Sequence, residues 1–308
     1  MKGESSSPAE SRPAAVTNFA DRLRAAVEGK RSCLVVGLDP RIEQLPGALR
    51  TKGLCSSAAA AASVLEFNRR VIEAVAPYAV AVKPQAAFHE ALGWRGFRAL
   101  EETIKSAREA GLLVIADAKR GDIGPTAEAY ATAILDRMDA DAATVNPYFG
   151  EEGIAPFLSR AAAGKGIFVL VRTSNPSSAE IQDLATPGGR VCERVARMVA
   201  RWGEPYLGEC GYSAVGGVVG ATFPNEVSHM RSLMPRTWLL LPGYGAQGAT
   251  AQDCAGAFDA AGLGGVVNSS RAIIYAFAKG PTRDWQKAIA EAARRTRDEL
   301  EEVRSRRP

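Results

Sequence analysis

The sequence predicts an α/β fold in which eight parallel strands close into a single (β/α)8 barrel. Two observations carry this prediction. Eight short apolar runs follow one another between Cys33 and Val267, each bounded by polar, glycine or proline residues. Stretches with the apolar periodicity of amphipathic helices lie between these runs, as expected when each strand is followed by a helix.

The first run, Cys33 to Leu38, is apolar throughout, as a strand of a parallel sheet buried on both faces should be. The strands are expected at 33–38, 79–82, 112–116, 142–145, 166–171, 214–219, 238–241 and 265–267. The helices are expected at 21–27, 64–75, 97–110, 126–138, 154–163, 191–202, 251–261 and 285–303. An open Rossmann-like sheet is the alternative, but it would have a Gly-rich turn after the first strand, where this chain has Asp39-Pro40-Arg41.

The barrel is expected to occupy residues 19–304 as one domain, between a disordered polar N-terminal tail at 1–18 and a C-terminal tail at 305–308. The N-terminal residues are rich in Ser and Pro and lack the apolar segment of a signal peptide. No apolar run approaches the roughly 18 residues needed to span a bilayer. These features indicate a cytoplasmic protein that has no membrane partner.

Composition and charge exclude several classes of function. With 46% hydrophobic and 23% charged residues, the composition is that of an ordinary globular protein. The net charge of +4 is small and dispersed, which argues against nucleic acid as a partner. The five cysteines form no Cys-x-x-Cys pair, and the only histidines, His89 and His229, do not suggest a triad or a multi-histidine metal site. The chemistry must therefore rest on Lys, Asp and the backbone.

One charged stretch, Asp117-Ala118-Lys119-Arg120-Gly121-Asp122, directly follows the apolar run 112–116. If the strand extends to Lys119, its two-residue period places Asp117 and Lys119 on the same side of the sheet. Asp122 lies beyond Gly121, so it must reach this cluster by a turn or serve a cluster in a second subunit. A surface ion pair is the simpler interpretation, but Lys83 ends a matching apolar run and favours a functional site.

Polar side chains follow most of the other predicted strands, and a barrel gathers such side chains at the mouth where its active site lies. They are Asp39, Lys83, Asn146, Thr173, Ser174, Ser269, Ser270 and Arg271. The loop after the seventh run, 242–248, is glycine-rich, and Arg271 follows the eighth run ahead of a helical segment. Backbone N–H groups and an arginine at these positions are typical of a phosphate site. Plain turn glycines with a surface arginine are the alternative.

Together these residues resemble the orotidine 5′-phosphate decarboxylase family. The resemblance is strongest from Asp117 to Thr126, which matches the family's Asp-x-Lys-x-x-Asp signature with its following Ile and Thr. Three further segments, 82–85, 173–176 and 269–271, are similar to the longer bacterial and archaeal-type subgroup. The resemblance implies a barrel enzyme that converts orotidine 5′-phosphate to UMP, the last step of pyrimidine synthesis, with no metal or other cofactor.

The resemblance also implies a role for each matching position. Lys83, Asp117, Lys119 and Asp122 would form an alternating charged array in which Lys119 stabilises and protonates a carbanion at C6. The substrate-binding positions would be Asp39 and Thr126 at the ribose, Ser174 at the pyrimidine edge, Gln247 and Arg271 at the phosphate, and in addition Ile123 and Ser270. Asp122 and Thr126 would come from the other subunit of a homodimer with shared active sites.

Other functions remain open from the sequence. A phosphosugar decarboxylase or synthase of the same barrel group has a related Asp-x-Lys signature but requires Mg²⁺. A Schiff-base aldolase could use Lys83 or Lys119, since both end predicted strands. A non-catalytic nucleotide-binding barrel would keep the phosphate site, although it has no need for so many clustered charges.

Overall fold

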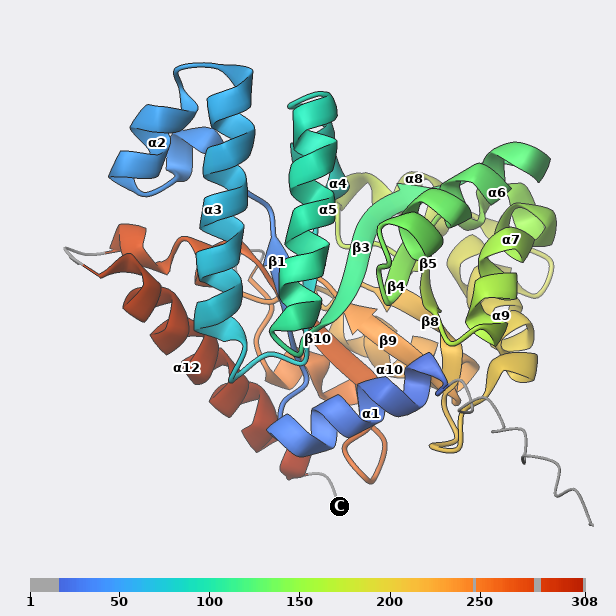
Figure 1. Ribbon diagram of the computed structural model, residues 1–308. Helices are drawn as coiled ribbons and strands as arrows, with labels where there is room; N and C mark the ends of the chain where they lie inside the picture. Colours follow the sequence, from blue (N-terminus) through green and yellow to red (C-terminus); the bar gives the residue numbers. More distant parts are fainter. Residues whose placement is uncertain (1–16, 246–247, 280–283, 307–308) are drawn as a thin grey trace, which may run out of the picture.

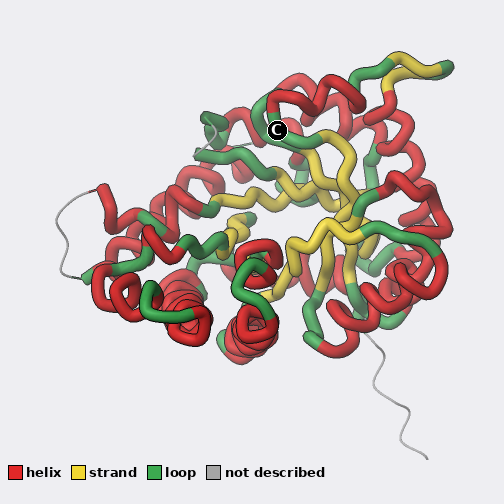
Figure 2. The backbone as a smooth tube through the Cα atoms, turned by 90° about the horizontal axis from the view of Figure 1, so that it is seen from above, coloured by secondary structure: helices red, strands yellow, loops and turns green. Residues whose placement is uncertain are grey.

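The computed structural model describes residues 17–245, 248–279 and 284–306. Eight parallel strands form a closed barrel in the order β1-β10-β9-β8-β5-β4-β3-β2, so the predicted (β/α)8 fold is confirmed. The barrel strands are β1 Leu34–Leu38, β2 Ala81–Pro84, β3 Leu113–Arg120, β4 Ala142–Val145, β5 Gly166–Arg172, β8 Ser213–Val219, β9 Thr237–Leu241 and β10 Gly265–Ser269. Figure 2 shows the strands in the middle of the molecule with helices around them.

Most of the helices surround the barrel on its outer face, and α1 lies across its lower end. The longer ones are α1 Phe19–Lys30, α3 Ser57–Val75, α5 Trp94–Glu109, α6 Gly124–Ala131, α7 Gly150–Ala162, α9 Val191–Gly203, α10 Pro224–Leu233 and α12 Trp285–Ser305. The shorter ones are α2 Gly47–Gly53, α4 Ala86–Glu90, α8 Ala179–Gln182 and α11 Arg271–Ile274. A small antiparallel hairpin, β6 Ala185–Thr186 with β7 Gly189–Arg190, lies outside the barrel sheet. In Figure 1, α12 crosses α3 at the side of the barrel, and the two helices pack against each other.

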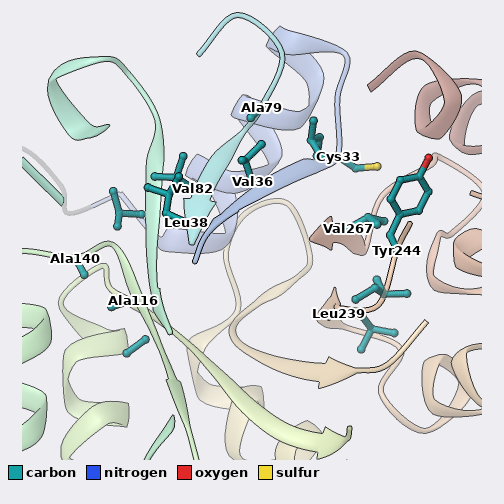
Figure 3. Packing of buried hydrophobic residues seen from close by; sticks show 14 of the residues in the cluster. Cys33, Val36, Leu38, Ala79, Val82, Ala116, Ala140, Leu239, Tyr244 and Val267 are labelled. Carbon is teal, nitrogen blue, oxygen red and sulfur yellow. The ribbon is translucent and has the colours of Figure 1, made fainter. Parts of the chain in front are cut away.

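Side-chain alternation along the strands divides the apolar residues into two cores. In β1, Leu34, Val36 and Leu38 pack outward against the helices, and Figure 3 shows part of this outer core. Val35 points into the barrel, where it joins the inner core. Helix α1 contributes to the same inner core, and Figure 1 shows it lying across the lower end of the barrel, opposite the mouth. The ring of Phe19 packs edge-on against Phe168 at 6.0 Å and closes this floor.

The same alternation decides which side chains reach the mouth. Every second residue of a strand faces the same side, so the residues in step with Val35 and Phe168 form a row that faces into the barrel along the whole length of each strand. At the carboxyl ends this row consists of Lys83, Asp117, Thr144, Leu170, Val218, Leu240 and Asn268, all of which line one cavity. A buried polar layer therefore lies on top of an apolar one, because polar residues occupy four of these inward positions.

The structure corrects several predicted boundaries. Residues 251–261 form only a 3-10 helix, Gln252–Ala257, and the chain becomes extended at Phe258. Gly256 lies inside this segment, and a glycine in a helix interior disfavours a regular α-helix. The helix expected at 126–138 is α6 followed by a π-helical turn, Thr132–Arg137. The N-terminal tail was expected to include Asn18, but this residue caps α1 by accepting a hydrogen bond from the backbone N–H of Ala20.

Some elements have no counterpart in the prediction. These are α2, α4, α8, α10 and the β6–β7 hairpin. At the other end of the chain, α12 extends to Ser305, one residue beyond the predicted end of the barrel domain. Among the described residues, no helix combines the length and the apolar character that crossing a membrane requires.

Candidate active site

A cavity of about 400 Å³ opens at the carboxyl ends of the barrel strands. Its floor is the inward-facing polar and apolar row described above. Its walls come from Lys119, near the end of β3, and from the segments that follow the strands, which contribute Asp39, Gln85, Thr173, Ser174, Asn175, Pro242, Gly243, Tyr244, Ser270 and Arg271. The position agrees with the general rule that the active site of a (β/α)8 barrel lies at this end.

The carboxylate of Asp117 lies at the centre of the cavity floor and accepts four hydrogen bonds. Its Oδ2 accepts from the ammonium of Lys83 and from Gln85 Nε2 at 3.0 Å. Its Oδ1 accepts from Lys119 Nζ at 2.6 Å and from Thr144 Oγ1 at 2.9 Å. Because each oxygen has two donors, the orientation of the carboxylate is fixed before any ligand binds.

Charges in this cluster stabilise one another despite their burial. Burial by itself raises the pKa of Asp117, but the ammonium groups of Lys83 and Lys119 outweigh burial and hold that pKa well below its ordinary 3.8. Burial lowers the pKa of Lys83, whereas Asp117 and Asp39 act in the opposite direction, and the net shift is upward. The cluster therefore holds an ionised carboxylate and an ammonium at neutral pH.

Lys119 reaches the cavity by a backbone conformation that the sequence did not predict. Simple alternation in an extended strand was expected to bring it beside Asp117, and the two side chains are indeed neighbours. However, Lys119 has a left-handed φ of 47°, and the pairing of β3 with β4 shifts register between Ala116 and Arg120. Its backbone N–H donates to Thr144 Oγ1 at 3.0 Å, which supports this unusual conformation. The side chain is 46% exposed, so its ammonium faces the open cavity.

Two buried polar atoms beside the cavity have no hydrogen-bond partner among the described residues. They are Asp39 Oδ1 and Asn268 Oδ1. Asp39 follows β1 and Asn268 lies on β10, and the two strands are neighbours in the barrel. Buried polar atoms are normally paired, so these two oxygens are suited to hydroxyl or N–H groups of a polar ligand.

A glycine in β1 makes room for the loop after β10. A Cβ placed on Gly37 would lie 1.8 Å from Ser270 Oγ and 3.2 Å from Asn268 Oδ1. Only glycine therefore allows Ser270 to approach β1 so closely. This close approach places a hydroxyl and the side chain of Arg271 at the same end of the cavity.

The loop after β9 forms another wall of the cavity. Tyr244 lines it, but its hydroxyl donates to Glu299 of α12 and so points away from the centre. Arg271, at the start of α11, is exposed and lines the cavity. The predicted phosphate ligand Gln247 lies outside the described residues.

Three predicted site residues do not reach the cavity of their own chain. Asp122, Ile123 and Thr126 follow β3, and none of them lines the cavity. Asp122 Oδ1 accepts a hydrogen bond from the N–H of Ile123 at 2.8 Å, Ile123 is 49% exposed, and Thr126 is exposed. This arrangement agrees with the expectation that Asp122 cannot share the strand face of Asp117.

Several polar residues of the cavity were not predicted as site residues, among them Gln85, Thr144, Asn175 and Asn268. Thr144 and Asn268 are the last inward-facing residues of their strands, so strand parity could have found them. Gln85 comes just after β2, and its backbone forms an isolated parallel bridge with Asp117. No periodic signal marks that bridge in the sequence. No cluster of three or more His, Cys, Asp or Glu suited to a metal ion occurs in the described part of the chain.

The fold and the site define a class, the (β/α)8 barrels that carry a Lys–Asp–Lys array at the mouth. Residues 32–288 match the orotidine 5′-phosphate decarboxylase / HUMPS family, and the chain belongs to this family. It is 43% identical to an orotidine 5′-phosphate decarboxylase of Rhodopirellula baltica, over 92% of this chain and 98% of the relative. It is 46% identical to one of Deinococcus radiodurans, over 92% of this chain and 96% of the relative.

A solved structure supports the same assignment. The chain is similar to Leishmania donovani OMP decarboxylase, with a TM-score of 0.77 and 33% identity, over 94% of this chain and 100% of the other. The family expected from the segments 82–85, 117–126, 173–176 and 269–271 is therefore confirmed.

Proposed function

We propose that the protein decarboxylates orotidine 5′-phosphate to UMP. The observation that carries the proposal is the placement of Lys119 Nζ 2.6 Å from Asp117 at the open mouth of the barrel, in a chain similar over most of its length to decarboxylases of this substrate. The relatives favour this reaction over a Mg²⁺-dependent phosphosugar reaction, an aldolase or a binding protein. A cytoplasmic location, where a phosphorylated substrate is available, is part of the same proposal.

The reaction breaks the bond between C6 and the carboxylate and leaves the electron pair on C6, in the plane of the ring. No neighbouring carbonyl delocalises this pair, so the protein must stabilise it by electrostatics. The ammonium of Lys119 does so, and then transfers a proton to C6 as the C–H bond of UMP forms. CO₂ leaves, and Lys119 recovers its proton from solvent.

Asp117 has a positioning and an electrostatic role in this proposal. Its four hydrogen-bond donors hold the carboxylate of Asp117 in one orientation. Asp117 therefore cannot rotate away from a substrate carboxylate that binds beside it. The repulsion between the two carboxylates disappears when CO₂ leaves. Lys83, on the far side of Asp117, keeps that aspartate ionised.

The remaining cavity residues bind the rest of the substrate. We assign the ribose hydroxyls to Asp39, whose Oδ1 has no partner among the described residues, together with Lys83. Ser174 contacts the pyrimidine edge from the loop after β5. Arg271, Ser270 and Gln247 hold the phosphate, whose binding energy contributes to catalysis at the distant ring carbon.

A homodimer with shared sites completes the proposal. Asp122, Ile123 and Thr126 would enter the partner's cavity, which explains why they do not line their own. Nearby, Tyr148 and Phe149 expose 83% and 44% of their surface, and together with Ile123 they provide apolar area for such an interface.

The decisive test is a spectrophotometric assay of orotidine 5′-phosphate decarboxylation, with and without a chelator. We expect full turnover in both, with UMP as product. Turnover that depends on added Mg²⁺, or UMP binding with no turnover, would contradict the proposal.

The shared site can be tested with two inactive variants. Lys119→Ala and Asp122→Ala should each be inactive alone, and mixing them should restore part of the activity, because a hybrid dimer contains one intact site. Absence of recovery, despite subunit exchange shown by mass spectrometry, would place Asp122 outside the partner's site.

A further inference from the structure

One segment at the rim of the cavity is supported by an unusually dense polar network. This segment, 173–175, directly follows β5, and all three of its residues line the cavity. It leads into α8 and the β6–β7 hairpin, which connect it to α9. Loops that line a binding site must be held by contacts behind them if they are to present their groups in one geometry.

Arg172, the last residue of β5, is the centre of this network. It is only 4% exposed. Its Nη1 donates to Ser178 Oγ at 2.7 Å and to Gln182 Oε1 at 3.2 Å, and its Nη2 donates to Asp183 Oδ2 at 2.9 Å. The guanidinium also lies over the ring of Phe223, 5.2 Å from its centroid. A buried cation persists only when such partners offset its desolvation.

Gln182 connects this buried cation to the cavity wall. Its Oε1 accepts from the backbone N–H of Thr173 at 2.9 Å as well as from Arg172. Its Nε2 donates to Thr173 Oγ1 at 2.7 Å, and that hydroxyl donates to Asn175 Oδ1 at 2.6 Å. Both groups of the amide therefore act on Thr173, the residue next to Ser174.

The network is anchored on its outer side by a second arginine. Asp183 also pairs with Arg190, and Arg190 contacts Glu193 and Glu226. These contacts join the loop after β5 to α9 and α10. The network thus extends from the cavity wall to two helices of the barrel.

We infer that Arg172 and Gln182 are positioning residues that hold segment 173–175 for recognition of the pyrimidine ring. This inference rests on the proposed function, in which Ser174 contacts the base. Neither residue lines the cavity, so both act through Thr173. Because the segment is ordered before the ligand binds, less conformational entropy is lost on binding.

The test compares a ligand that has a base with one that lacks it. Calorimetry would measure binding of UMP and of ribose 5-phosphate to the wild-type protein and to Gln182→Ala. The variant loses two hydrogen bonds to Thr173, so UMP should bind about ten-fold more weakly. Ribose 5-phosphate does not reach the pyrimidine end, and its affinity should change less than about two-fold.

Two further variants separate positioning from general damage to the loop. Glu180→Ala is the control. Glu180 lies on the same helix, and its side chain is exposed and makes no hydrogen bond in the described structure, so this variant should bind both ligands normally. Gln182→Glu keeps an oxygen acceptor for Thr173 N–H and Arg172. Its affinity for UMP should therefore be closer to that of the wild type than to that of Gln182→Ala. Arg172→Lys keeps the charge but lacks the planar fork of donors that contacts Ser178, Gln182 and Asp183 at once, so it should resemble Gln182→Ala.

Equal losses for UMP and ribose 5-phosphate in Gln182→Ala would overturn the inference, as would an unchanged affinity for UMP. The proposed function fails separately. If the wild-type protein binds UMP but does not decarboxylate orotidine 5′-phosphate, the catalytic proposal is wrong. The loss of affinity in Gln182→Ala, compared between UMP and ribose 5-phosphate, still tests the positioning role in that case. A wild-type protein that binds neither ligand would overturn both.

Discussion

Two aspartates lie at opposite ends of the barrel and are buried to almost the same extent, yet their surroundings differ. Asp117 is 4% exposed and Asp141 is 3% exposed. Asp117 is at the mouth, on β3, and accepts from two lysines whose side chains line a cavity. Asp141 is at the floor, immediately before β4.

The partners of Asp141 belong to the floor of the barrel, and none of them lines the cavity. Its Oδ1 pairs with Arg22 of α1, and its Oδ2 accepts from the backbone N–H of Val114 at 2.9 Å. Arg22 also donates to the carbonyl of Gly164 at 2.9 Å, so α1 is attached to the floor through this ion pair. Burial and pairing are therefore alike at the two ends. What distinguishes the mouth is an ammonium, that of Lys119, that faces an open cavity.

The largest effect expected from this comparison is on catalysis at the mouth. Lys119→Ala removes both the stabilising charge and the proton donor, so kcat should fall by about 10⁴-fold or more. The side chain is 46% exposed, and its loss should leave the unfolding free energy within about 1 kcal/mol of the wild type. Steady-state kinetics and urea denaturation measure the two quantities. A variant with near-normal kcat would remove Lys119 from the proton-donor role.

Asp117→Asn should reduce stability as well as activity, in a way that depends on pH. The substitution leaves Lys83 buried without its carboxylate, which should cost about 3 kcal/mol at neutral pH. Because the folded-state pKa of Asp117 lies below its ordinary 3.8, its contribution is fully present above about pH 4 and is lost as the pH falls further. Urea denaturation at pH 7 and pH 3 should show the difference between variant and wild type shrinking. If the difference in unfolding free energy between variant and wild type grew toward pH 3, the pKa of Asp117 would be shifted in the opposite direction.

Asp141→Asn should affect stability alone. It removes the charge that pairs with Arg22, and since Arg22 is partly exposed the cost should be about 2 kcal/mol. The kcat/KM of the folded fraction should remain within about two-fold of the wild type, because the floor is closed off from the cavity. Thermal unfolding and kinetics at low temperature provide the check. A large loss of kcat in a fully folded variant would show that the two ends are coupled.

A matched pair of glycine substitutions gives the most selective effects, one on activity and the other on stability. In Gly37→Ala, at the mouth, the new Cβ would displace Ser270, so kcat/KM should fall about ten-fold through weaker phosphate binding. In Gly216→Ala, deeper in the barrel, the Cβ would lie 2.4 Å from the ring of Phe168 and should cost about 1–3 kcal/mol of stability instead. Equal effects of the two substitutions on kcat/KM would contradict the separation of mouth and floor.

Much of the contrast between the two aspartates could be predicted from local sequence. Asp117 follows an apolar run and Asp141 precedes one. In a parallel barrel all strands point the same way, so a residue after a strand lies at the mouth and a residue before a strand lies at the floor. The same reasoning, extended by strand parity, identifies Thr144 and Asn268 as inward-facing residues of the mouth.

The partners of these aspartates could not be predicted in the same way. Arg22 is 119 positions from Asp141, and Gln85 is 32 positions from Asp117. Gln85 and Arg172 do not stand out in the sequence, because their roles depend on loops that meet only after the barrel closes. The apolar periodicity of 251–261 likewise did not distinguish the short 3-10 helix from the α-helix that was expected.

The sequence by itself determined the strands, the order of the charged residues and the end of the barrel that each would occupy. These features follow from the two-residue repeat of a strand and the single direction of a parallel barrel, which are local rules. Only the tertiary structure decided the left-handed turn at Lys119, the four donors to Asp117 and the support behind segment 173–175. Those features depend on distances between side chains far apart in the chain, and packing of the whole barrel sets these distances.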